Sequence, residues 1–199
     1  MATPRTVGIL IFPEVEILDF CGPFEVFSSA HAPTGERLFN ALTVAESRDL
    51  ITCRGGLLVQ PNVTFADAPH FDILVAPGGF GTDQQQENPV LLDWLKQQAA
   101  ANELTTSVCT GAFLLGASGL LDGRRATSHW STIERLTDFV PAATVLNDVR
   151  VVDEGEVITS AGVSAGIDMA LHVVQRLHGD AVAVATARDM EYDWGYAPA

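Results

Sequence analysis

The strongest constraint on the fold is an alternation of buried-strand and helical patterns along the chain. The segment Val7–Phe12 is a continuous apolar run ended by Pro13, which is typical of a strand covered on both faces. Ile17–Ser29 follows it with apolar residues at helical spacing. A second buried-strand pattern at 71–76 is likewise followed by a helical pattern at 88–101. Strands that alternate with helices predict a three-layer α/β sandwich, with a mostly parallel central sheet and helices on both faces.

Shorter patterns complete the expected elements. Further strands are expected at 37–46, 51–53, 57–59, 105–108, 124–128, 150–152 and 157–159, and further helices from 110 to near 119, at 132–139, at 163–178 and at about 180–190. Gly55-Gly56 and residues 153–156 are typical hairpin turns, and Asn88 with Pro89 is a typical helix start. Neither a repeat nor a linker interrupts these patterns, so we expect one domain over 1–199.

Composition excludes several function classes. With 199 residues and 47% hydrophobic content, the chain can bury a sizeable core. A net charge of −14 argues against nucleic-acid binding, which needs a basic face. Three cysteines without metal-like spacing predict neither a disulfide framework nor a metal site, and they favour a reducing, cytoplasmic compartment. The apolar runs are too short for a bilayer and the N-terminus lacks a signal-peptide pattern, so we expect no membrane association.

Cys109 is the main candidate for chemistry. A short β-prone run ends at this cysteine, and a small-residue helical pattern begins directly after it. Such a strand-to-helix elbow places the side chain at a helix N-terminus, where backbone N–H groups and the helix dipole favour the thiolate. The pattern therefore predicts a nucleophile. The alternative is a small, inert buried side chain, which is common for free cysteines.

Two further candidates follow strands that end at the same edge of the sheet as Cys109. Asp19 is an acid among apolar residues, and burial would raise its pKa toward values useful for proton transfer. Its alternative role is to stabilise the helix dipole as an acid in the first turn of the helix. Gly78 and Gly79 allow close approach of the backbone, so their N–H groups are candidate donors to a ligand, whereas a plain tight turn remains the alternative.

His129 follows a short β segment and stands beside Trp130. It is either a catalytic partner of Cys109 or a packing residue. Cys21 lies two positions from Asp19 and is a candidate for the surroundings of the same pocket, although packing is the simpler role for Cys21 and Cys53. The other histidines show no metal-like spacing.

The chain resembles the DJ-1/PfpI superfamily of class I glutamine amidotransferase-like proteins over nearly its whole length. The stretches that carry the resemblance are 107–130, Phe12-Pro13 with 18–23, 76–79 and 160–168. This resemblance implies a flavodoxin-like fold. Within the superfamily, isonitrile (isocyanide) hydratases and the ligand-binding domain of AraC-type transcription regulators share these sequence motifs.

Several features separate these branches. The chain ends at Ala199, which leaves no room for a helix-turn-helix region, and its acidic charge opposes DNA binding. The ending at 190–194 is similar to the hydratase branch, but the longer C-terminal tail of that branch is missing. PfpI peptidase-like members have a histidine after the cysteine, where this chain has Thr110. DJ-1 itself has a glutamate where this chain has Asp19.

The resemblance implies a cofactor-free, cysteine-dependent hydratase or hydrolase of a small electrophile, with an isonitrile converted to an N-substituted formamide by an isonitrile hydratase-like hydro-lyase. Cys109 is then the nucleophile and Asp19 the proton carrier. Gly79 and Thr110 would hold the polar end of the substrate. The loop Gly162-Val163-Ser164 would close the pocket. A redox or small-molecule stress sensor of the DJ-1 type and a glyoxalase-like hydratase are the alternatives, and a homodimer is expected.

Overall fold

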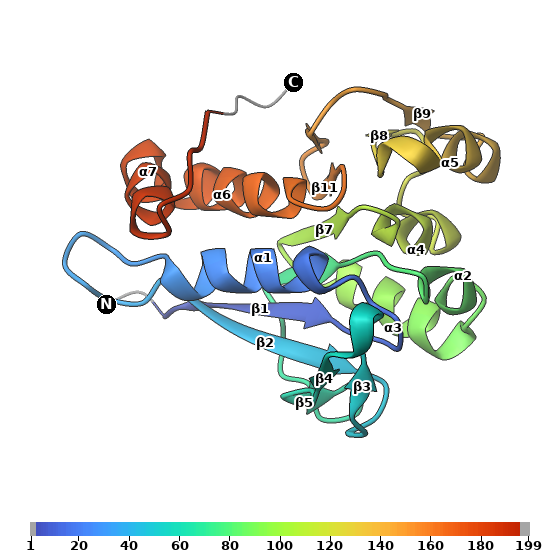
Figure 1. The fold of residues 1–199 in the computed structure, drawn as a ribbon, viewed down its shortest axis with the longest axis horizontal. Coiled ribbons are helices and arrows are strands. Elements are labelled where there is room, and N and C mark those ends of the chain that lie inside the picture. The colour runs from blue at the N-terminus through green and yellow to red at the C-terminus, as the bar shows by residue number, and fades with distance from the viewer. Residues whose placement is uncertain (1–2, 196–199) are drawn as a thin grey trace.

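The computed structural model describes residues 3–195 and contains a seven-stranded central sheet (Figure 1). Its strands, in spatial order, are β10 (Val151–Asp153), β11 (Val157–Ser160), β7 (Leu104–Val108), β6 (Ile73–Ala76), β1 (Arg5–Leu10), β2 (Phe39–Ala45) and β5 (Val63–Thr64). Every neighbouring pair is parallel except β10 and β11, which form the antiparallel hairpin that the sequence predicts. The expectation of a mostly parallel sheet is confirmed.

Helices cover both faces of this sheet, as expected. The α-helices of the described residues are α1 (Ile17–Ser29), α2 (Thr82–Gln85), α3 (Pro89–Ala99), α4 (Gly111–Ala117), α5 (Ile133–Phe139), α6 (Ala165–His178) and α7 (Asp180–Asp189). Helices α1, α6 and α7 pack against one another on one face, while α3 and α4 pack together on the other (Figure 1). The architecture is therefore the three-layer α/β sandwich that the alternating pattern predicts.

Two small sheets flank the carboxyl edge of the central one. Strands β3 (Ile51–Thr52) and β4 (Leu58–Val59) pair antiparallel around a single 3₁₀ turn at Arg54–Gly56. Gly55 and Gly56 have φ values of 81° and 89° there, a region that glycine enters without steric cost. Strands β8 (Arg125–Ala126) and β9 (Thr144–Val145) pair in parallel beside α5.

Local signals set several element boundaries. The Asn88 side chain accepts hydrogen bonds from the N–H groups of Val90 and Leu91, with Pro89 at the first helical position, so the predicted start of α3 is confirmed. Helix α6 begins at Ala165 instead of the expected Val163, because Gly162–Ser164 forms a loop. Within the described residues, no helix is both long and apolar enough to cross a bilayer.

The central strands place the functional candidates together. Strand β7 is buried along its whole length although it carries Thr105, Thr106 and Ser107. Thr106 Oγ1 donates to the Leu74 carbonyl at 3.0 Å and Thr105 Oγ1 pairs with the Asn102 side chain, whereas Ser107 Oγ is buried without a hydrogen-bond partner among residues 3–195. The carboxyl ends of β1, β6, β7 and β11 then meet at one edge, and the loops that carry the predicted site residues leave from it.

Candidate active site

Cys109 occupies the predicted elbow between β7, which ends at Val108, and α4, which begins at Gly111. Its φ of 57° is uncommon for a residue with a side chain. Two hydrogen bonds hold this conformation: the Cys109 N–H donates to the Ser160 carbonyl at 3.1 Å, and Ser128 Oγ donates to the Cys109 carbonyl at 2.8 Å. The backbone is thus fixed by neighbouring segments, and the thiol is aimed out of the strand.

Asp19 lies in the first turn of α1 and is fully buried. Its Oδ2 atom accepts the Gly78 N–H at 3.0 Å. Its Oδ1 atom is buried without a standard hydrogen-bond partner among residues 3–195. The side chain interacts with that of Cys109, so the two predicted catalytic residues do lie together. Because a buried oxygen without a partner is costly, its persistence beside a thiol marks a candidate for proton transfer.

The surroundings raise the pKa of both groups. Burial raises the pKa of Asp19 to about 7; the Gly78 N–H opposes this rise, nearby Glu16 adds to it, and Arg54 opposes it. Burial and the charge of Asp19 raise the pKa of Cys109 to about 12, against the N–H and hydroxyl groups of Thr110. The expectation of a resting thiolate is therefore wrong, because burial and a neighbouring carboxylate outweigh the helix N-terminus.

The glycine pair acts differently from the prediction. The Gly78 N–H is bound to Asp19, and the Gly79 N–H donates to Thr110 Oγ1 at 3.0 Å. Both amides are therefore engaged within the protein, whereas the sequence predicted that they would face a ligand. A Cβ atom at Gly78 would lie 2.6 Å from the Thr110 nitrogen, which shows how tightly this backbone packs. In this structure the glycines orient the acid and the threonine.

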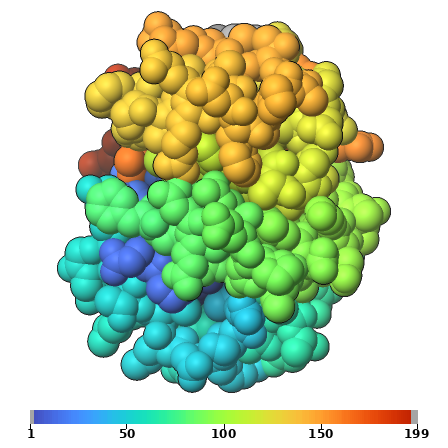
Figure 2. All heavy atoms as spheres, turned by 90° about the vertical axis from the view of Figure 1, so that its right-hand side faces the viewer, coloured from blue at the N-terminus to red at the C-terminus, as the bar shows by residue number. Residues whose placement is uncertain are grey.

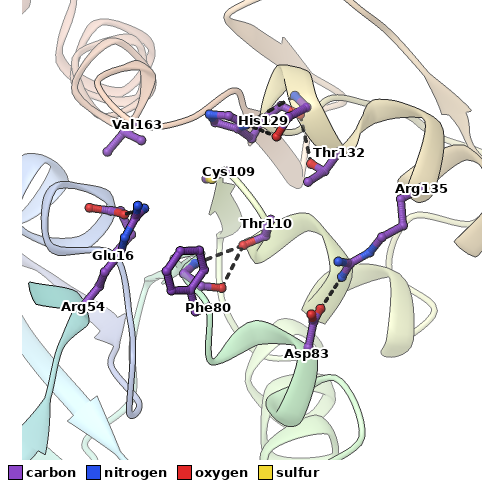
Figure 3. Close-up of a pocket in the computed structure, with 12 residues that line it drawn as sticks. Glu16, Arg54, Phe80, Asp83, Cys109, Thr110, His129, Thr132, Arg135 and Val163 are labelled. Carbon is purple, nitrogen blue, oxygen red and sulfur yellow. Dashed lines mark hydrogen bonds and ion pairs between the residues drawn. The ribbon is translucent and has the colours of Figure 1, made fainter.

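A cavity of about 510 Å³ opens over Cys109 at the carboxyl edge. It is lined by Glu16, Arg54, Gly79, Phe80, Asp83, Cys109, Thr110, His129, Ser131, Thr132, Arg135 and Val163 (Figure 3). Figure 2 looks onto this edge, with the segment around α2 in green next to that of α5 and β9 in yellow and orange. The cavity thus joins residues from six separate parts of the chain around one thiol.

Two ion pairs at this cavity were missed by sequence reasoning. Arg54 pairs with Glu16 and also lies over the Phe80 ring, 4.3 Å from its centroid. Arg135 pairs with Asp83 on the other side (Figure 3). The hairpin turn at Gly55-Gly56 was visible in the sequence, but nothing showed that it folds back onto the start of α1. Because each arginine is matched by a carboxylate, the wall carries no net charge from these pairs.

The predicted closing loop reaches the site with two of its three residues. Val163 lines the cavity. A Cβ atom at Gly162 would lie 2.7 Å from both Cys109 Sγ and His129 Cδ2, so this backbone covers the thiol closely. Ser164 is different, because it is exposed and Arg150 donates to its hydroxyl at 3.3 Å. Its predicted place in the pocket wall is therefore wrong.

His129 and Cys21 differ in their relation to the cavity. His129 lines it, and its Nδ1 accepts the Ser131 N–H at 3.3 Å and lies 2.8 Å from Ser131 Oγ. The neutral ring then carries its proton on Nε2. Its ring also makes a tilted contact with the exposed Trp130, at 5.5 Å between centroids. Cys21 is half-buried against the core and is not part of the cavity wall.

Comparisons with known proteins place the chain within one family. Residues 5–176 match the DJ-1/PfpI family. The chain is 38% identical over 193 residues to an isonitrile hydratase of Pseudomonas putida, an alignment that covers 97% of this chain and 79% of the hydratase. It is 25% identical to the HTH-type transcriptional regulator GbdR of Pseudomonas aeruginosa, but spans 51% of that protein.

The fold agrees as well. A crystal structure of a ThiJ/PfpI family protein from Pseudomonas syringae superposes with a TM-score of 0.86 at 34% identity, covering 96% of this chain and 76% of the other. The match to the family extends over most of the chain and includes the elbow at Cys109, the loop at Gly78-Gly79 and the start of α1. The chain therefore belongs to the DJ-1/PfpI family.

Proposed function

We propose that this protein is a hydratase of small electrophiles that converts an isonitrile into an N-substituted formamide. The observation that carries the proposal is the buried Asp19 carboxylate, whose Oδ1 has no standard hydrogen-bond partner among residues 3–195 and whose side chain interacts with the Cys109 thiol in the cavity wall. A carboxylate with a pKa of about 7 exchanges a proton readily near neutral pH. The identity of 38% to an isonitrile hydratase supports the same chemistry.

In the first half of the proposed cycle, Asp19 accepts the thiol proton while Cys109 Sγ attacks the terminal carbon of the isonitrile. The new bond is C–S, and the Asp19 proton passes to the same carbon. The product of this half is a thioimidate, in which the former isonitrile carbon carries one hydrogen and is bound to sulfur. Asp19 is again a carboxylate at this point.

In the second half, Asp19 takes a proton from water, whose oxygen adds to the thioimidate carbon, and passes this proton to the nitrogen, so that Asp19 is again a carboxylate. Asp19 then accepts the hydroxyl proton as the C=O bond forms and the C–S bond breaks. The departing thiolate recovers that proton and becomes the resting thiol. In sum, one isonitrile and one water give one formamide, and Cys109 and Asp19 return to their starting states.

The protonation of Cys109 favours this role over that of a peroxide sensor. A sensor thiol reacts with peroxide as the thiolate, which is sparse when the thiol pKa lies at about 12. A hydratase needs the thiolate only as the substrate is attacked, when the neighbouring carboxylate removes the proton. The arrangement therefore suits a thiol that becomes reactive in the presence of its substrate.

The test measures formamide formation from an aryl isonitrile by the wild type, Cys109→Ala, Asp19→Asn and the control Cys21→Ala. We expect turnover in the wild type and in Cys21→Ala, whose side chain lies outside the cavity. We expect a loss of at least about a thousandfold in the other two. Equal rates in the wild type and Cys109→Ala would contradict the proposal, as would stoichiometric oxidation of Cys109 at low peroxide without turnover.

A further inference from the structure

Thr82 is a buried polar residue next to the site whose hydroxyl has a single partner. It begins α2, is 1% exposed and is not part of the cavity wall. Its Oγ1 atom lies 3.0 Å from Thr110 Oγ1, which is its one hydrogen-bond contact within the described chain. Since a buried hydroxyl keeps its proton in a hydrogen bond, Thr82 donates to Thr110.

This direction fixes the hydrogen bonds of Thr110. A hydroxyl oxygen has two acceptor positions and one proton. The Gly79 N–H occupies one acceptor position at 3.0 Å, and Thr82 occupies the other. The proton of Thr110 is then left for one of two acceptors, the Gly79 carbonyl at 3.4 Å or the sulfur of Cys109, with which the hydroxyl also interacts.

The choice between these acceptors depends on the state of the sulfur. A neutral thiol is a weak acceptor, so the carbonyl competes well with it. A thiolate accepts a charge-assisted hydrogen bond and outcompetes the long contact to the carbonyl. We propose that Thr82 is a positioning residue that orients the Thr110 hydroxyl, so that its proton turns to Cys109 Sγ when the thiolate forms. The role of this reorientation in turnover rests on the proposed function. The effect of Thr82 on the pKa of the Cys109 thiol does not.

The structure gives Thr82 no direct part in the reaction. Its hydroxyl acts through Thr110, and it touches neither Cys109 nor the cavity in the described contacts. If Thr82 could not donate, Thr110 would lose one of its two fixed donors and would orient its proton less reliably. We therefore expect the Cys109 thiolate to become less stable while the position of its Sγ atom stays the same.

The test follows alkylation of Cys109 by iodoacetamide, with the labelled residue identified by mass. It uses the Asp19→Asn background, since removing that charge lowers the thiol pKa into a measurable range. Thr82→Val in this background should move the midpoint of the pH profile upward by about one pH unit, a roughly tenfold change in the ratio of thiolate to thiol. The plateau rate above the midpoint should stay the same.

Two further variants keep the result decisive. Thr82→Ala, which also lacks the donor without adding bulk, should move the midpoint in the same direction, and Thr82→Ser should restore it. An unchanged midpoint in Thr82→Val and Thr82→Ala overturns the proposal, and so does a changed plateau with a fixed midpoint, which indicates misplacement of the sulfur. Alkylation needs no isonitrile, so a shifted midpoint in a protein without hydratase turnover would reject the proposed function alone.

Discussion

The side chain of Asp19 faces Cys109, and each group changes the acidity of the other. The charge of the Asp19 carboxylate helps to raise the pKa of Cys109 to about 12, while the thiol acts as a hydrogen-bonding partner that lowers the pKa of Asp19. Burial still holds the pKa of Asp19 at about 7. The pair therefore titrates as a unit, and near neutral pH its resting form carries the proton on sulfur.

Asp19→Asn should separate thiol reactivity from turnover. Removing the charge lowers the thiol pKa, so iodoacetamide should alkylate Cys109 roughly tenfold faster at about pH 8. The same variant should lose hydration of an isonitrile, because it cannot accept the thiol proton. Asp72→Asn, at the opposite end of β6, is the control and should change neither rate. Slower alkylation in Asp19→Asn would mean that the carboxylate stabilises the thiolate in the free protein.

The same substitution should stabilise the fold at alkaline pH. The pKa of Asp19 rises from its ordinary 3.8 to about 7 on folding. Its contribution to stability is therefore present below about pH 3.8 and is lost as the pH rises to about 7. Asp19→Asn should exceed the wild type in unfolding free energy by up to about 4 kcal/mol at pH 8. Urea unfolding at about pH 8 and about pH 4 measures this, and an equal difference at both would contradict it.

Glu16 and Arg54 should move the pH profile of turnover in opposite directions. Turnover should rise with pH as Asp19 ionises, with a midpoint near its pKa of about 7. Glu16 raises that pKa and Arg54 lowers it. Glu16→Gln should therefore move the midpoint down, and Arg54→Gln should move it up, each by roughly half a pH unit.

The second ion pair of the cavity provides the control for these charges. Asp83 and Arg135 are not among the main causes of the pKa shift of Asp19, although both line the same cavity. Asp83→Asn and Arg135→Gln should therefore leave the midpoint in place. A midpoint that moved equally in all four variants would show that the profile reports another group.

Local sequence patterns were sufficient to predict many of the helices, strands and turns of this fold. The range of α1 agrees with its prediction, and Asn88, Gly55-Gly56 and the elbow at Cys109 act as expected. These features depend on neighbours in sequence, such as helical spacing or a capping side chain. Strands β5 and β9 were not predicted, and β8 was expected only as part of 124–128. A two-residue strand is too short to show a recognisable sequence pattern.

The site was harder to predict, because its electrostatics depend on distant contacts. Arg54 reaches Glu16 across a hairpin that folds back, a contact that no local pattern indicates. The protonation of Cys109 depends on burial and on Asp19, which is ninety residues earlier in the chain. The sequence predicted that these two residues would meet, but the amount of water excluded around them decides which one holds the proton.

Gly78→Ala should inactivate the site without removing any functional group. The added Cβ would lie 2.5 Å from Thr110 Oγ1, 2.6 Å from the Thr110 nitrogen and 3.0 Å from Asp19 Oδ2. The backbone must therefore move, and the acid moves away from the thiol. We expect turnover to fall by roughly a hundredfold or more, because small displacements of reacting groups have large effects on rate.

The control for this substitution is Gly195→Ala, where a Cβ meets open space. Gly195→Ala should keep both the turnover and the unfolding free energy of the wild type. Gly78→Ala should also lose about 1–3 kcal/mol of stability, as overpacked sites do. Measuring both quantities separates the two effects: a folded Gly78→Ala protein with full turnover would show that the spacing of Asp19 and Thr110 around Cys109 does not control the reaction.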